Sequence, residues 1–217
     1  MKPGVCTVNR SSLRLLLLVL LSLGLGACAP ALFQGAEQPQ LRSYLLDWSG
    51  NQQAAAINPE GPRLLIAPVR AAAGFESSDM VYIRHPHQLE HFANHRWVDA
   101  PARMLEPLLL QAALDSGLFK SVAASGSGTQ VDLRLDTTLL QLQQVCAAQA
   151  SELQMSLRVQ LVDVAAARLL ASELLSISEP LSEAKPAAGV EAANRALAKL
   201  MSQLQVFLGR HLPQADG

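Results

Sequence analysis

"VDLRLDTTL", residues 131–139, and "LQMSLRVQL", residues 153–161, are the stretches that decide the fold class of this chain. In both of them apolar residues alternate with polar or charged residues. A period of two is that of a β-strand with one face buried and the other in water. The two stretches therefore predict adjacent antiparallel strands, and a third strand is expected over residues 168–178, after a short connection.

Shorter strands are expected on the N-terminal side of this pair. They cover residues 43–48, 63–69, 80–84, 88–93 and 119–122. Residues 63–69 are almost continuously apolar, with Pro62 and Pro68 as bounds of the run, which is typical of a strand buried on both faces. Residues 80–84 and 88–93 are expected to form a hairpin around Pro86.

One helix is predicted over residues 99–116, with Asp99 as its cap and Gly117 as its end. Pro107 conflicts with a regular helix there, because proline lacks the backbone N–H that bonds the preceding turn. Either the helix kinks at Pro107, or its regular part begins near Glu106 with the proline in the first turn.

A second helix is predicted over residues 190–208, where apolar residues recur at helical spacing. These elements together predict a single α/β domain, with α+β as the alternative, over residues 43–210. Its mixed β-sheet would contain antiparallel hairpins and be flanked by at least two α-helices.

The N-terminus carries the pattern of an export signal. Lys2, Arg10 and Arg14 precede an apolar run over residues 15–25, which is the length of a signal-peptide core. It is shorter than the roughly 20 residues that a spanning helix needs. The run ends in Leu-Gly-Ala-Cys at residues 25–28, which resembles a bacterial lipobox; an ordinary secretory signal with a chance cysteine is the alternative.

The lipobox resemblance implies cleavage between Ala27 and Cys28 and lipidation of Cys28, with palmitate or a similar acyl chain as the membrane anchor. Residues 1–27 would be the signal peptide and residues 28–42 a tether, while 211–217 are expected to form a tail. Ala29 stands where aspartate would mark retention in the inner membrane. This favours anchoring in the outer membrane, with the domain facing the periplasm.

The composition excludes several function classes. Without residues 1–27 the chain has 190 residues, with 14 Lys and Arg against 18 Asp and Glu. This is not the clustered basic charge of a nucleic-acid-binding protein. Cys146 would be the one free thiol, so no intramolecular disulfide is expected, and it is interpreted as a small core or hairpin residue.

Four of the five histidines, His85, His87, His91 and His95, lie within eleven residues of each other. A zinc or copper site is one interpretation, and a polar hairpin surface is the favoured one. No acidic or cysteine residue stands at strict ligand spacing, and Pro86 interrupts the strand. Nucleophile-elbow and phosphate-loop motifs are absent from the sequence, so we expect neither an enzyme nor a bound cofactor.

Residues 81–105, taken whole, resemble the signature of the ABC-type transport auxiliary lipoprotein family. The pattern is a strand ending in Tyr-x-Arg, a Leu/aromatic hairpin, an Arg-Trp pair and a proline at a helix start. This chain carries it as Tyr82 and Arg84, Leu89 and Phe92, Arg96 and Trp97, and Pro101. The histidines occupy its variable positions. The resemblance extends over residues 43–208, although Ala165 to Ala167 stand where a glycine-bearing turn is common.

The resemblance implies a non-enzymatic component of a transport system built from an ATPase, a permease and an MCE-domain protein. Such systems move phospholipid or other hydrophobic molecules between the two membranes of a Gram-negative envelope and support membrane integrity. Tyr82, Arg84 and Trp97 are the candidate residues for binding the MCE protein, because such side chains dominate interface energetics. For Phe92 and Trp97, packing against the core is the favoured interpretation, and an anchor for a protein partner is the other. Since MCE proteins assemble as rings, homo-oligomers of this chain are compatible with the resemblance.

Two other functions remain open from the sequence. One is an envelope-assembly lipoprotein unrelated to lipid transport. The other is a periplasmic metal-binding protein that uses the four clustered histidines.

Overall fold

A long antiparallel ladder forms the centre of the sheet. β7 (Leu133–Cys146) pairs with β8 (Ser151–Asp163), which pairs in turn with β9 (Arg168–Pro180). Leu139, Leu157 and Leu175 lie opposite one another across the three strands, and each is almost completely buried. The alternation of the sequence is thus that of a sheet with one core-facing side, as predicted.

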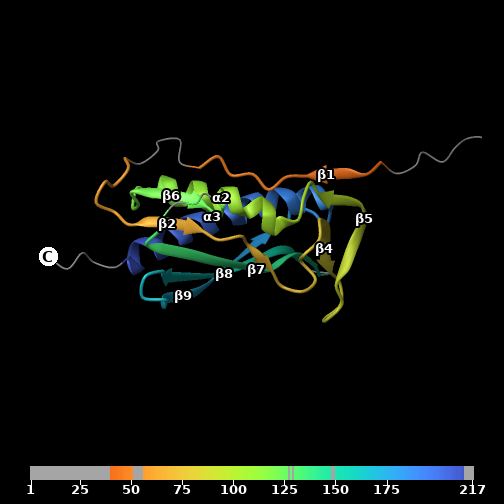
Figure 1. Cartoon of the computed structure of the whole chain (residues 1–217). Helices are drawn as coiled ribbons and strands as arrows, with labels where there is room; N and C mark the ends of the chain where they lie inside the picture. The colour runs from red at the N-terminus through yellow and green to blue at the C-terminus, as the bar shows by residue number, and fades with distance from the viewer. Residues whose placement is uncertain (1–39, 51–55, 127, 129, 148–149, 213–217) are drawn as a thin grey trace, which may run out of the picture. The chain divides into compact units, whose positions relative to one another are not determined.

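The computed structural model describes residues 40–50, 56–126, 128, 130–147 and 150–212 (Figure 1). All the described residues except Gln40 belong to the second of two compact units, Leu41–Gly217. The predicted signal segment, Ala27, Cys28, residues 29–39 of the tether and residues 213–217 of the tail lie outside the described residues. No helix in the described ranges is long and apolar enough to cross a membrane.

Shorter strands from the N-terminal half complete a mixed sheet. Three of them join β7 in parallel, namely β2 (Arg63–Ile66), β3 (Arg70–Ala71) and β4 (Asp79–Ile83). β6 (Ser121–Ala124) lies parallel to β2. On the other side, β5 (Glu90–Trp97) runs antiparallel to β4, and β1 (Arg42–Tyr44) runs parallel to β5. The main strand order is β1-β5-β4-β7-β2-β6.

Both described helices lie on the same side of the sheet (Figure 1). α2 (Pro101–Asp115) and α3 (Pro186–His211) also contact each other, and Gln205 Nε2 on α3 donates to the carbonyl of Ala112 on α2 at 3.0 Å. The core sits between this helix pair and the inward face of the sheet. The prediction of a mixed sheet with antiparallel hairpins and helices is confirmed, and the arrangement is that of an α+β domain.

The prediction that residues 63–69 form a strand buried on both faces is wrong. β2 ends at Ile66, and only Leu64 and Ile66 are buried, whereas Leu65 between them is half-buried. With the helices on one side, the other face of the strand lacks a helical layer. An uninterrupted apolar run therefore overstated its burial.

The start of α2 also differs from the prediction. Ala100 is the N-cap and makes no side-chain capping bond, while Pro101 occupies the first turn. The Asp99 carboxylate accepts hydrogen bonds from the Ala100 N–H at 2.7 Å and from Arg103. The helix passes through Pro107 to Asp115, so its regular part does not begin near Glu106. Pro107 is exposed, which places the ring on the solvent side of the helix.

Two backbone positions carry local constraints. Ala167, in the β8–β9 turn, has φ of 48°, a left-handed conformation that glycine adopts more readily. Gly189, in the first turn of α3, lies so close to β7 that a Cβ there would sit 1.8 Å from Nε2 of Gln144. Gln144 is 2% exposed, and its Oε1 has no hydrogen-bond partner among the described residues.

Candidate partner-binding site

The end of β4 and the start of β5 hold a small network of fixed polar side chains. Tyr82 and Glu90 are direct cross-strand neighbours in the β4–β5 pair. The Tyr82 hydroxyl donates to Oε2 of Glu90 at 2.9 Å, and Arg84 Nε donates to Oε1 of Glu90 at 3.0 Å. Arg84 Nη2 also donates to Oε2, so the guanidinium and carboxylate form a bidentate ion pair.

The ring of Tyr82 contacts both Phe92 and the guanidinium of Arg84. It lies 4.4 Å from the ring of Phe92, centroid to centroid, and the guanidinium carbon of Arg84 lies 5.3 Å from the Tyr82 centroid. Arg84 therefore combines a carboxylate partner with a contact to an aromatic face. Its side chain remains 57% exposed, whereas that of Glu90 is 16% exposed. A fixed cation is thus presented at the surface.

The electrostatics keep the network charged at neutral pH. The hydrogen bond from Arg84 is the main cause that lowers the pKa of Glu90, against the raising effect of its partial burial. The bond to Glu90 in turn raises the pKa of Tyr82, which holds the phenol as a proton donor. The hydrogen bonds to Glu90 use Nε and Nη2 of Arg84 and leave Nη1 outside this pair.

The structure removes Trp97 from the predicted contact surface. Trp97 ends β5, pairs with Tyr44 of β1 and is only 2% exposed. Its side chain belongs to the core, as the favoured interpretation predicted, so it can support the site but not touch a partner. Phe92 is half-buried, and its ring packs against both the core and the ring of Tyr82.

Glu90 is the residue that the sequence interpretation missed. Tyr82 and Arg84 were identified as candidates, but their common partner lies across the hairpin, six residues after Arg84. The cross-strand register of the hairpin would have identified it, but that register depends on an irregular β4–β5 pairing. Only the folded hairpin makes the pairing evident.

The histidines of this region are dispersed rather than convergent. His95 Nδ1 lies 2.9 Å from the hydroxyl of Tyr44, and His91 Nδ1 lies 3.9 Å from Asp79. His85 and His87 are exposed in the hairpin turn, where His87 has φ of 66°. Within the described ranges, no group of three or more His, Cys, Asp or Glu side chains is placed to hold a metal ion.

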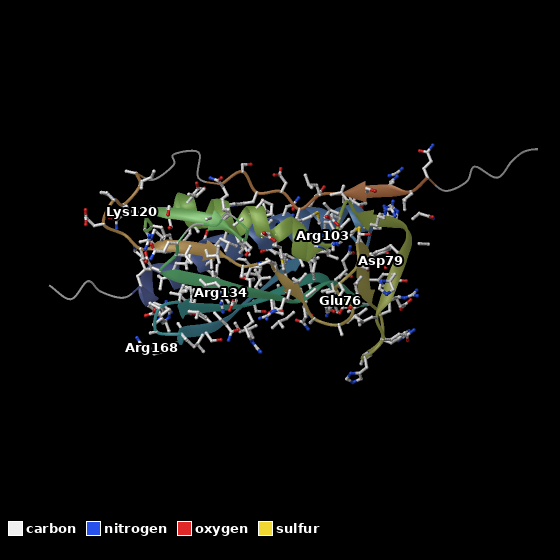
Figure 2. The ribbon with its side chains drawn as sticks, viewed as in Figure 1. Glu76, Asp79, Arg103, Lys120, Arg134 and Arg168 are labelled. Carbon is white, nitrogen blue, oxygen red and sulfur yellow. The ribbon has the colours of Figure 1, made fainter. Side chains whose placement is uncertain are left out.

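Cys146, at the end of β7, is half-buried, and burial raises the pKa of its thiol. Since a thiolate is the reactive form of cysteine, this environment does not activate it as a nucleophile. Two other charged residues form ion pairs within the domain: Arg63 binds Asp132, and Asp99 binds Arg103. Figure 2 labels Asp79 at the start of β4, Arg103 on α2 and Arg134 on β7.

Comparisons with known proteins find a matching family model and solved structures of similar fold. A family model described as "ABC-type transport auxiliary lipoprotein component" matches residues 44–205. A search of curated proteins finds no match. Among solved structures, the protein XCC0632 from Xanthomonas campestris is 22% identical with a TM-score of 0.62, and covers 78% of this chain and 92% of its own.

A second solved structure, of an uncharacterised protein, is 14% identical with a TM-score of 0.61. The match covers 78% of this chain and 99% of that one. At such identities these likenesses show a shared fold. The family match covers the β4–β5 hairpin, α2, the central ladder and most of α3.

Proposed function

Since this chain belongs to the ABC-type transport auxiliary lipoprotein family, we propose that it is a non-enzymatic adaptor of an MCE-type system that transports lipid. Cys28 would carry the lipid anchor in the outer membrane, and the domain would face the periplasm. There it would bind the MCE-domain protein of a system whose permease and ATPase supply the energy. The cargo would be phospholipid or another hydrophobic molecule.

The observation that carries the adaptor role is the Arg84 arrangement. A half-exposed guanidinium is held by Glu90 and by the face of Tyr82, on a hairpin at one side of the sheet. Because the side chain is already ordered, binding a partner's carboxylate or carbonyl there costs less conformational entropy than ordering a free arginine. Such preorganised arginine and tyrosine side chains are typical of interface anchors.

A pull-down tests the proposed partner. The tagged protein is recovered from gently solubilised membranes, and co-purifying proteins and lipids are identified by mass spectrometry. We expect an MCE-domain protein and its permease. Recovery of outer-membrane assembly factors without an MCE protein would favour the envelope-assembly alternative, and stoichiometric metal in protein purified without a His-tag would favour the metal-binding one.

A matched pair of arginine variants tests the surface. Arg103 is 71% exposed and also forms a two-pronged pair with an aspartate, Asp99, but lies on α2. We expect Arg84→Ala to reduce recovery of the MCE protein and Arg103→Ala to leave it unchanged. Equal recovery with both variants would contradict the assignment of the surface to β4 and β5.

The anchor has its own test. Cys28→Ala should release the protein into the soluble periplasmic fraction and abolish transport, while the circular dichroism spectrum of the domain stays unchanged. A Cys28→Ala variant that remains membrane-bound and active would be incompatible with a lipid anchor at this residue.

A further inference from the structure

β1 brings an exposed apolar patch to the edge of the sheet, at the start of the folded domain. Leu41 is 50% exposed and Leu45 is 53% exposed, although both are large aliphatic side chains. Val98, which follows β5, is 54% exposed. We call these three residues the β1 patch.

The fold holds the β1 patch in place. The Val98 N–H donates to the Tyr44 carbonyl at 2.8 Å and continues the parallel pairing, which puts Val98 beside Leu45. The Asp47 N–H donates to Oδ1 of Asn194 on α3 at 3.1 Å. Successive residues of a strand point to opposite sides, so Tyr44 and the buried Leu46 face inward while Leu41 and Leu45 face outward. The exposure is therefore a fixed property of the edge strand.

One exposed cation lies on the same side of the sheet as the β1 patch. Arg96 on β5 is the neighbour of Ser43 on β1, so it shares the outward side of Leu41 and Leu45. Asp99 directly follows Val98 but pairs with Arg103, and Asp79, which lies opposite Arg96 in the β4–β5 pair, accepts a hydrogen bond from the Ser77 hydroxyl. Aliphatic side chains beside an exposed arginine are a combination found in protein segments that lie at a membrane interface.

The length of chain before β1 limits how far the β1 patch can lie from an anchor at Cys28. Twelve residues, 29–40, separate Cys28 from Leu41. Fully extended, they span at most about 40–43 Å. A lipid at Cys28 would hold β1 within that distance of the bilayer and would convert a weak contact into an intramolecular one, with an effective concentration of the order of millimolar.

We propose that the β1 patch rests on the surface of the membrane that anchors the protein, with Leu41, Leu45 and Val98 entering the headgroup region and Arg96 contacting lipid phosphates. The proposal rests on the proposed lipid anchor at Cys28. It orients the domain, because the remaining strands then extend away from the bilayer in the order β5, β4, β7.

A fluorescent probe at matched positions tests this orientation. Leu174, on β9, is 55% exposed and lies on a strand remote from β1 in the sheet order. In a Cys146→Ser background, an environment-sensitive dye is attached to Leu45→Cys or to Leu174→Cys of the lipidated full-length protein. Each protein is reconstituted into phosphatidylethanolamine–phosphatidylglycerol vesicles that contain spin-labelled phospholipid, and flotation and quenching are measured.

We expect both proteins to float with the vesicles, with several-fold stronger quenching and a blue-shifted emission at position 45 only. Flotation with no quenching at 45, or with equal quenching at both positions, would overturn the proposal and leave the anchor intact. A blue shift at 45 without quenching by spin-labelled lipid would mean that a second copy covers the patch, and would also overturn it. Failure to float would overturn the anchor at Cys28 together with the proposal.

Discussion

Replacing Gly189 with alanine should destabilise this protein, although the same change in most helices stabilises. The Cβ would sit 1.8 Å from Nε2, 2.3 Å from Cδ and 2.9 Å from Cγ of Gln144. Three atoms of one side chain are involved, so moving only its tip would not relieve the overlap. Gln144 is 2% exposed, and the void beside it, lined by Met80, Trp97 and Leu153 among others, is too small to receive the displaced amide.

The magnitude follows from two opposing terms. Alanine is favoured over glycine in a helix by about 1 kcal/mol. Forcing extra atoms into a well-packed core costs about 1–3 kcal/mol. Because the overlap is severe and the site is closed, we take the upper end, which gives a net loss of about 2 kcal/mol in the free energy of unfolding. For a domain of this size the melting temperature should then fall by about 4–8 °C.

Circular dichroism during urea and thermal denaturation measures the effect, and the same helix offers a control. At Gly209 an added Cβ would meet only Leu118 Cδ1, at 3.7 Å, so Gly209→Ala should be neutral or stabilise by up to about 1 kcal/mol. Gln144→Ala makes room for the new methyl group. In that background Gly189→Ala should be neutral or stabilising, so the double-mutant cycle should show a coupling of about 2 kcal/mol.

Two results would refute this reasoning. If Gly189→Ala is as stable as Gly209→Ala, then the close approach of α3 to β7 does not require a glycine. If Gly189→Ala is equally destabilising with and without the Gln144 side chain, then the cost has another origin than this contact.

Three further predictions concern charge and backbone strain. The Glu179 side chain is 4% exposed and binds two cations of α3, so Glu179→Gln should cost about 2–3 kcal/mol in urea denaturation, while Glu183→Gln, which breaks an exposed pair, should cost under about 1 kcal/mol. The arginine partner of Asp132 lowers the pKa of this carboxyl from 3.8 to about 2; the folded value lies below the unfolded one, so its stabilisation is present above pH 3.8 and is lost as the pH falls towards 2. The stability difference between wild type and Asp132→Asn, no more than about 1 kcal/mol for this exposed pair, should vanish over that interval, and a difference independent of pH would contradict the assignment. Ala167→Gly should raise the melting temperature, because the left-handed conformation of Ala167 costs about 1–2 kcal/mol that glycine does not incur. An unchanged or lower melting temperature would argue against strain in this turn.

The sequence was most informative where local periodicity and burial coincide. The alternation in β7 and β8 predicted both strands and their core faces, because one side of each faces the helices and the other faces solvent. The prediction from the sequence failed at residues 63–69, because the apolar residues there continue on the side of the strand that no described helix covers. Periodicity reports which residues are apolar, whereas the number of layers over a sheet depends on where distant helices pack.

The candidate site shows the same limit. Tyr82 and Arg84 could be identified from a local motif, but Glu90 could not, since its role depends on the register of an irregular hairpin. Trp97 was ambiguous in the sequence because the same side chain serves interfaces and cores equally well. Only its pairing with β1 at the end of β5 decides for the core.

The position of β7 has a consequence for how the chain reaches its folded state. This strand accepts β2, β3 and β4 from the N-terminal half and β8 from the C-terminal half, and Leu64 meets Leu133 across 69 residues of sequence. Forming such parallel, non-local pairs requires the closure of long loops. The chain loses this conformational entropy before the strand contacts stabilise it, which slows folding. The N-terminal strands cannot complete their sheet until β7 has been synthesised. A chain exported by an N-terminal signal, as proposed here, would therefore remain unfolded long enough to be threaded through a translocation channel.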